Sequence, residues 1–194
     1  MLEASLILLA AYVIGSISFA QIAGKINGFN LRDHGSGNLG ATNVGRVCGK
    51  YWGIAVLILD CLKGFFPTYF AMQYFQSPWW HVVVGAVVIV GHSLSIFANF
   101  KGGKGVASAL GMLLALNASV AGIILVIVLS VITITKYVSL GSIIGCLLMP
   151  LGFYYVQAPV AYLVVVSIMG VFIVWRHRSN IVRLVHGKEN KLNG

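Results

Sequence analysis

Five long apolar stretches, separated by short polar segments, constrain the fold of this chain more than any other feature. They cover residues 2–23, 51–74, 79–98, 106–135 and 138–175. An α-helix needs roughly 20 apolar residues to cross the hydrocarbon core of a bilayer. Charged residues make up only 9% of the chain, against about 25% in a typical soluble domain. The sequence therefore predicts an all-α integral membrane protein, with residues 1–194 forming a single transmembrane domain.

The distribution of basic residues predicts how the chain is oriented. Lys and Arg gather in segments 24–50, 100–105 and 176–191, whereas the turns at 75–78 and 157–159 contain none. Because basic residues concentrate in cytoplasmic loops, the three basic segments are expected inside and the two turns outside. The N-terminus is then outside and the C-terminus cytoplasmic.

The number of crossings follows from that orientation. An even number must separate the 100–105 turn from the C-terminal tail, so the last two apolar stretches each supply two crossings. The first of these stretches folds back near Asn117, and the second is broken at residues 157–159. The prediction is a compact bundle of about seven transmembrane helices, in which the fourth, residues 106–116, is short. Five spans with a re-entrant piece are the alternative.

The first basic segment contains the string HGSGNLGATNVGR, residues 34–46. Glycine lets the backbone approach a ligand closely and leaves its N–H groups exposed, which suits a phosphate or a carboxylate. A flexible cytoplasmic linker is the alternative interpretation. The candidate ligand-binding residues are Gly35, Ser36, Gly37, Asn38, Thr42, Asn43 and Arg46.

The second basic segment lies in NFKGGKGVAS, residues 99–108, between two apolar stretches. A helix that starts after the glycines would offer free N–H groups to an anion. The phosphate-binding pattern of nucleotide hydrolases is not met, since Gly105 and not Ser or Thr follows Lys104. A tight basic turn between spans is the alternative. The candidate residues are Lys101, Gly102, Gly103, Lys104 and Gly105.

The third basic segment follows the last apolar stretch. His177, Arg178 and Asn180 come directly after it, and the apolar residues at 181, 184 and 185 predict a short helix lying on the membrane surface. A basic orientation tail is the alternative, although such a tail needs neither His177 nor Asn180. These polar segments share the predicted cytoplasmic face, which suggests one pocket for a ligand with more than one phosphate.

A few polar residues fall within the apolar stretches. Asp60 and Lys63 are three apart on one helical face and are expected to form an ion pair. His92 is expected to be a hydrogen-bonded packing residue, and Ser139 and Ser142 could line the same pocket as the basic segments. No histidine has the spacing to Cys, Asp or Glu that a metal site requires, so neither a metal nor a cofactor is expected.

Four strings carry a resemblance to a known family: GSGNLGATNVGRVCG (35–49), LDCLKGFFP (59–67), GHSLSIFANFKGGKGVAS (91–108) and HRSNIVRLVHGKEN (177–190). In this order, over nearly the whole chain, they resemble the bacterial acyl-phosphate:glycerol-3-phosphate acyltransferase family, often called PlsY. Leu94, Ser95 and Ser108 stand where the family pattern has Phe, Pro and Thr. These departures bear on helix bending and leave the expected anion-binding groups in place.

The resemblance implies a multi-pass enzyme of the bacterial inner membrane, with a cytoplasmic active site, no nucleic-acid partner and no cofactor. The protein is expected to be a monomer. Such enzymes move a fatty acyl group from acyl phosphate to the 1-hydroxyl of glycerol 3-phosphate, which gives lysophosphatidic acid and phosphate, the first acylation of phospholipid synthesis. By resemblance, the glycine turn with Lys104 binds glycerol 3-phosphate. The family pattern also marks Ser36, Arg46, His177, Asn180 and Glu189.

Acyl phosphate is already activated, so the expected mechanism is direct attack by the glycerol hydroxyl without an acyl-enzyme. His177, Asn180 and Ser36 are the expected catalytic residues, and Glu189, Asp60 and Lys63 are expected to be structural. Either His177 or a substrate phosphate oxygen could take the proton. The rival classes are a membrane transporter for a phosphorylated metabolite and a non-catalytic scaffold.

Overall fold

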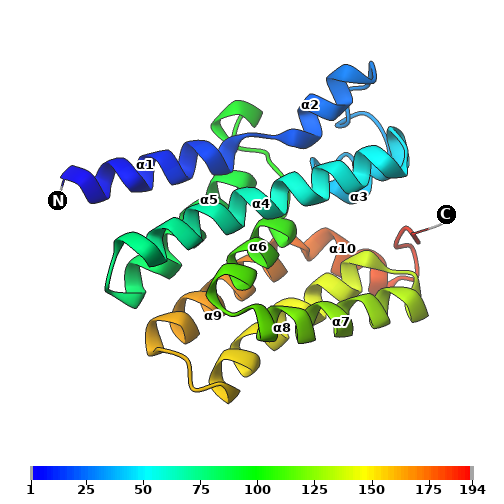
Figure 1. The fold of residues 1–194 in the computed structure, drawn as a ribbon. Coiled ribbons are helices and arrows are strands. Elements are labelled where there is room, and N and C mark those ends of the chain that lie inside the picture. The colour runs from blue at the N-terminus through cyan, green and yellow to red at the C-terminus, as the bar shows by residue number, and fades with distance from the viewer. Residues whose placement is uncertain (1, 193–194) are drawn as a thin grey trace. The chain divides into compact units, whose positions relative to one another are not determined.

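The fold is given by a computed structural model that describes residues 2–192 (Figure 1). The predicted domain ends, residues 1 and 193–194, lie outside the described residues. Within 2–192 the regular structure is helical, without a β-strand, and the all-α prediction is confirmed. The helices form two compact units, one up to Leu116 and one from Asn117. That residues 1–194 act as one domain stays a prediction.

The first unit is built around α4 (Lys50–Tyr74), the longest of its helices. α5 (Pro78–Ser93) and α6 (Val106–Leu116) pack against α4, and α1 (Leu2–Ser16) packs along α5. Figure 1 shows this layering. Three shorter elements lie near the ends of these helices. They are α2 (Phe19–Ile26), α3 (Ala41–Val47) and the 3-10 helix η1 (Ile96–Ala98).

Small residues allow α4 and α6 to approach closely. A Cβ atom added to Gly64 of α4 would collide with the carbonyl oxygen of Ser108 of α6. A Cβ added to Gly111 of α6 would collide with the carbonyl oxygen of Cys61 of α4. Such backbone contact is how helices associate tightly in lipid, where apolar side chains gain little by leaving the bilayer. The crossing fixes the start of α6, and therefore the exit of the turn that precedes it.

The second unit contains α7 (Ala118–Thr135), α8 (Val138–Tyr155), α9 (Val160–Arg176) and α10 (Arg178–Val185). α8 packs against both α7 and α9. Asn117 caps α7, since its side-chain oxygen accepts a hydrogen bond of 3.0 Å from the backbone N–H of Val120. The predicted helix breaks at Asn117 and at residues 157–159 and the short helix after residue 177 are confirmed. That the chain folds back at Asn117 stays a prediction.

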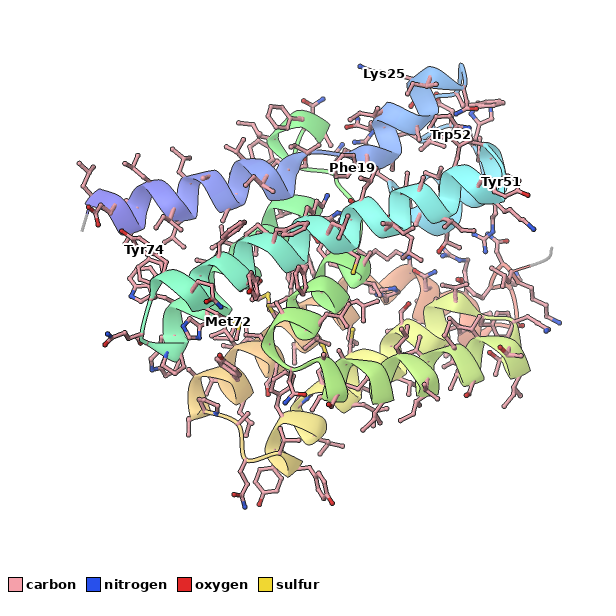
Figure 2. All side chains as sticks on the ribbon, in the orientation of Figure 1. Phe19, Lys25, Tyr51, Trp52, Met72 and Tyr74 are labelled. Atoms are coloured by element: carbon pink, nitrogen blue, oxygen red, sulfur yellow. The ribbon has the colours of Figure 1, made fainter. Side chains whose placement is uncertain are left out.

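The helices vary in their capacity to cross a membrane. Five segments of the described chain are long and apolar enough, and the bent pair α9–α10 adds a sixth. α6, with 11 residues, is shorter, as predicted. Figure 2 shows Tyr51 and Trp52 near one end of α4 and Tyr74 near the other, an arrangement typical of aromatic residues at two membrane interfaces. Seven crossings, and their orientation, stay predictions.

Candidate active site

The first glycine-rich loop is organised by Asn43, a buried residue in the first turn of α3. Its side-chain oxygen accepts a hydrogen bond of 2.8 Å from the backbone N–H of Ser36. Its amide nitrogen donates to the carbonyl oxygens of Leu31 (3.2 Å) and His34 (3.1 Å). A single side chain thus holds both ends of the loop segment that carries Ser36.

Two glycines give this loop its shape. Gly35 and Gly37 have φ values of +62° and +69°, a left-handed conformation that side chains disfavour. A Cβ atom added to Gly35 would also collide with the side-chain oxygen of Asn43. The turn places Ser36 before α3, whose last turn carries Arg46. The loop therefore combines constrained backbone with a hydroxyl, and the helix that follows it carries an arginine. That these groups form an anion site stays a prediction.

The second glycine-rich turn folds back on the end of α5. The backbone N–H of Gly102 donates to the carbonyl oxygen of Ser93 (3.0 Å), and that of Gly103 donates to the carbonyl oxygen of His92 (3.2 Å). Gly105, with φ of +88°, then reverses the chain into α6. Lys104 lies between these fixed points, so its Cα position is tightly determined. This rigidity is the property that a preorganised anion site needs.

The structure joins the two glycine-rich segments within the first unit. The guanidinium of Arg32 donates to the carbonyl oxygens of Ala98 and Lys101, each at 2.9 Å. A Cβ atom on Gly103 would lie 2.6 Å from the carbonyl oxygen of Leu39. In the sequence, Arg32 is one of the basic residues of segment 24–50 that predict the orientation of the chain. Its role as a link could not be read from the sequence, because it depends on carbonyl groups more than 60 residues away.

His177 and Asn180 lie where α9 bends by 58° into α10. Both are buried, with 3% and 5% of their surface exposed. The Nδ1 atom of His177 lies 2.8 Å from the carbonyl oxygen of Ile173. A carbonyl can only accept, so Nδ1 carries a proton and donates it. In neutral His177 the lone pair is therefore on Nε2, which can accept a proton or a hydrogen bond.

Glu189 binds the C-terminal segment to the rest of the second unit. One carboxylate oxygen accepts from Asn180 (2.6 Å) and Ser139 (2.9 Å), and the other accepts from Arg183 (2.7 Å). Burial by itself would raise the pKa of Glu189, but the hydrogen bonds from Asn180, Arg183 and Ser139 outweigh it and lower the pKa. Glu189 is thus ionised at neutral pH and orients Asn180. That its role is structural stays a prediction.

Replacing Glu189 with Gln is expected to destabilise the protein in a pH-dependent way. A carboxyl group whose pKa is lowered by folding contributes stability that is present above its unfolded pKa and lost as pH falls through the folded pKa. The thermal midpoint of Glu189→Gln in detergent should lie below that of the unmodified protein at pH 7, and the difference should shrink below about pH 4.3. Equal differences at pH 7 and at strongly acidic pH would contradict this role.

The remaining candidate residues make local contacts. The Ser142 hydroxyl donates to the carbonyl oxygen of Val138 one turn earlier (2.9 Å). The guanidinium of Arg178 lies 4.6 Å from the centre of the Trp175 ring, where a cation–π interaction fixes it. The predicted ion pair is present, with 2.7 Å between the Lys63 ammonium and the Asp60 carboxylate. That candidate residues from both units serve one pocket stays a prediction.

The chain is similar to known proteins over nearly its full length. A family model described as glycerol-3-phosphate acyltransferase matches residues 5–187. A glycerol-3-phosphate acyltransferase of Aquifex aeolicus is 40% identical over 191 residues, which cover 98% of this chain and 100% of that protein. Another, from Fusobacterium nucleatum, is 44% identical over 182 residues and 93% of each chain.

Two solved structures have the same fold. Both are crystal structures of PlsY, an integral membrane glycerol 3-phosphate acyltransferase, one in a glycerol 3-phosphate form and one in a lysophosphatidic acid form. The TM-scores are 0.95 and 0.92, at 40% and 39% identity, and each match covers 97% of this chain and 95% of the other. The family model, the full-length relatives and these structures agree, and the chain belongs to the glycerol-3-phosphate acyltransferase family.

Proposed function

We propose that this protein transfers a fatty acyl group from acyl phosphate to the 1-hydroxyl of glycerol 3-phosphate, at the cytoplasmic face of a bacterial inner membrane. The observation that carries the proposal is the pair of rigid glycine-rich segments in the first unit, joined by Arg32 and carrying Arg46 and Lys104. Both reactants contain phosphate, so the site needs more than one cation. One reactant also has an acyl tail, which suits a site at a membrane interface.

Each glycine-rich segment suits a different phosphate. The 35–38 loop, held by Asn43, presents backbone and the Ser36 hydroxyl and is proposed to bind acyl phosphate. The 101–105 turn, with Lys104, is proposed to bind the phosphate of glycerol 3-phosphate. A compact ammonium on a rigid turn holds an anion without rearrangement during the reaction, and such preorganised groups account for much of enzymatic rate enhancement.

His177 and Asn180 are proposed to act on the reacting groups. Because Nδ1 of His177 donates a hydrogen bond to the carbonyl oxygen of Ile173, Nε2 can accept a hydrogen bond from the hydroxyl of glycerol 3-phosphate and so orient it. Asn180, positioned by Glu189, is proposed to polarise the acyl carbonyl. Their action on the same reactants as the first unit rests on the resemblance to the family, and the protein is proposed to act as a monomer.

The hydroxyl is proposed to attack the acyl carbonyl carbon directly. The C–O bond to the acceptor forms, the bond from the carbonyl carbon to phosphate breaks, and inorganic phosphate leaves with the electron pair. A substrate phosphate oxygen takes the hydroxyl proton, because a pocket rich in cations disfavours a charged imidazolium at His177. Positioning and charge stabilisation then supply most of the rate.

Replacing His177 with Gln tests the identity of the base. Activity is expected to stay within about tenfold of the unmodified protein, since loss of an obligatory general base usually costs ~10²–10⁴-fold. The measurement is kcat in detergent with both reactants saturating, together with its pH profile. A larger loss would assign the proton to the imidazole, the alternative base.

Purified protein mixed with acyl phosphate and glycerol 3-phosphate tests the proposed reaction itself. Release of inorganic phosphate and formation of lysophosphatidic acid in equal amounts are expected. Acyl coenzyme A in place of acyl phosphate should give no product. A transporter would leave both reactants intact, and product formation from acyl coenzyme A alone would reject acyl phosphate as the donor.

A further inference from the structure

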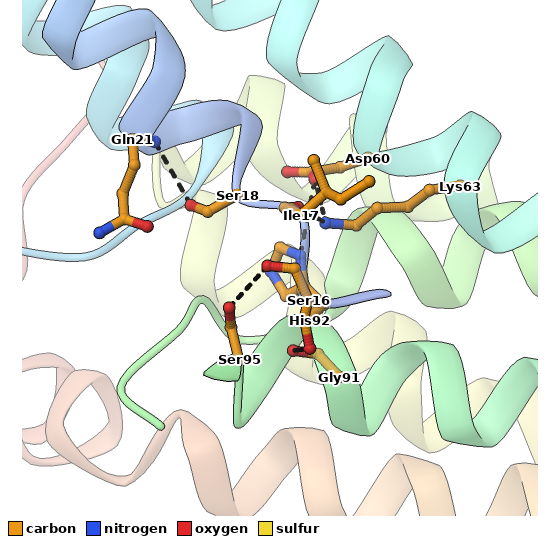
Figure 3. Close-up of polar contacts among 9 residues, drawn as sticks. All are labelled: Ser16, Ile17, Ser18, Gln21, Asp60, Lys63, Gly91, His92 and Ser95. Carbon is orange, nitrogen blue, oxygen red and sulfur yellow. Dashed lines mark hydrogen bonds and ion pairs between the residues drawn. The ribbon is translucent and has the colours of Figure 1, made fainter. Parts of the chain in front are cut away.

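A buried polar network surrounds the break between α1 and α2, where the chain leaves the first helix at Ser16 (Figure 3). The break removes the carbonyl oxygen of Ile17 from regular helical bonding. The ammonium group of Lys63 donates to that oxygen at 2.7 Å and pairs with the Asp60 carboxylate at the same distance. Asp60 and Lys63 have only 2% and 6% of their surface exposed, so this network lies inside the unit.

The network continues from Asp60 to the end of α5. The same Asp60 oxygen that pairs with Lys63 lies 3.5 Å from Nδ1 of His92, which is also buried. Figure 3 shows His92 beneath the break, with Asp60 above it. Asp60 therefore links two elements that are far apart in the sequence, the broken first span and the last turn of α5.

His92 in turn contacts the second glycine-rich turn through both its backbone and its ring. Its carbonyl oxygen accepts the hydrogen bond from Gly103. A Cβ atom added to Gly103 would collide with Nε2 of the imidazole, and one added to Gly102 would collide with the His92 carbonyl oxygen. The ring fills the space beside the turn, and only glycine fits there. The turn that carries Lys104 thus packs directly against His92, which determines its shape.

Serine hydroxyls hold the same region from a second side. The Ser95 hydroxyl donates to the carbonyl oxygen of Ser16 (2.6 Å), and the Ser16 hydroxyl donates to that of Gly91 (3.4 Å). Residues 91–95 are therefore fixed to the break on both sides of His92. Buried polar networks with satisfied partners are rigid, because each bond is strong where water is absent.

We propose that Asp60 and His92 are positioning residues for glycerol 3-phosphate: they hold the 101–105 turn in the shape that aligns Lys104 with the acceptor's phosphate. The inference rests on the proposed function, which assigns that phosphate to this turn. A buried ion pair often adds no net stability over an apolar replacement. The contact of Asp60 with His92, which packs against the turn, gives the buried charge a role that packing alone would not require.

Replacing His92 with Gln is the test, and His81→Gln is the matched control. His81 is a second buried histidine of α5, three turns earlier, where its Nε2 lies 2.7 Å from the carbonyl oxygen of Phe75. His92→Gln should raise KM for glycerol 3-phosphate about tenfold or more, since small displacements of positioning groups can cost up to ~10²-fold. KM for acyl phosphate should change by less than about twofold, and His81→Gln should leave both constants near their original values.

Several outcomes would overturn the proposal. Unchanged KM values for both reactants, with only less active enzyme, would mean that His92 only stabilises the fold. Equal increases in both KM values, or the same change in His81→Gln, would mean that the effect is not specific to the 101–105 turn. Should His92→Gln not accumulate, Asp60→Asn is measured by the same criterion, since KM does not depend on the amount of folded enzyme. Lys104→Gln distinguishes the positioning role of His92 from the proposed binding of glycerol 3-phosphate by the turn. If Lys104→Gln raises KM for glycerol 3-phosphate and His92→Gln does not, only the positioning role is wrong. If Lys104→Gln has no effect, the proposed function of the turn fails.

Discussion

Replacing Lys104 with Gln should lower kcat/KM for glycerol 3-phosphate by about 10²–10³-fold, the loss typical of removing one preorganised charge-stabilising group. Lys104 is partly buried and lies between Gly103, whose backbone is bonded to α5, and Gly105, which directly precedes α6. A charge held in this way costs no reorganisation when it meets a phosphate. Gln keeps much of the length of the Lys side chain and lacks its charge. The fall in kcat/KM therefore reports on electrostatics rather than on packing.

The control for that experiment is Lys25→Gln. Lys25 is an exposed lysine in the last turn of α2, in the same unit and outside both glycine-rich segments. Figure 2 shows it near the end of α4 that carries Tyr51, which is the end predicted to face the cytoplasm. Lys25→Gln should leave kcat/KM for both reactants unchanged. If the two variants behave alike, Lys104 does not bind substrate and acts only through the general positive charge of this face.

Replacing Asn43 with Asp should cost both stability and activity, although the two side chains have almost the same shape. The Asp carboxylate can still accept from the Ser36 N–H, but it cannot donate to the carbonyl oxygens of Leu31 and His34. Each buried group left without its partner costs about 1–3 kcal/mol. The two losses together, about 2–6 kcal/mol, should lower the thermal midpoint by roughly 4–24 °C in a protein of this length.

The catalytic effect of Asn43→Asp should be selective. The 35–38 loop is proposed to hold acyl phosphate, so kcat/KM for acyl phosphate should fall by more than about tenfold, as expected when a positioned group moves. Asn27→Asp is the control, because Asn27 makes a single side-chain bond, to the carbonyl oxygen of Ala23 (2.8 Å), at the end of α2. Unchanged kinetics in Asn43→Asp would show that the loop does not hold a reactant.

Much of the helical architecture could be predicted because apolar runs and their interruptions are local signals. Asn117 interrupts a 30-residue apolar run, and its side chain caps the next helix. The break at residues 157–159 contains Pro159, which precedes α9 directly. In both places the residue that directly precedes the next helix is visible in the sequence itself.

The break in the first span was not predicted. Residues 2–23 form a continuous apolar run, yet the chain separates into α1 and α2 after Ser16. Ser18 is the one local signal, since its hydroxyl accepts from the N–H of Gln21 and caps α2. Lys63 and Ser95, each more than 40 residues away, donate hydrogen bonds to the carbonyl oxygens at the break, and such partners cannot be read from the sequence.

In the candidate site, too, some features are visible in the local sequence and others depend on distant partners. Glycine density and adjacent charge identified both segments of the first unit, because these are properties of composition. The organising role of Asn43 was not identified, since it depends on burial and on three partners supplied by the fold. Glu189 entered only through the resemblance to the family, because its three donors come from residues 139, 180 and 183.

The central claim is that the protein brings two phosphate-bearing reactants together and does not carry the acyl group itself. Rapid-quench measurement of phosphate release in the first turnover, with enzyme and acyl phosphate at comparable concentrations, tests it most directly. Without glycerol 3-phosphate, no phosphate should be released and the intact protein should keep its mass. With it, phosphate and lysophosphatidic acid should appear together. A burst of phosphate equal to the enzyme, in the absence of glycerol 3-phosphate and with an acyl group on Ser36, would contradict the claim.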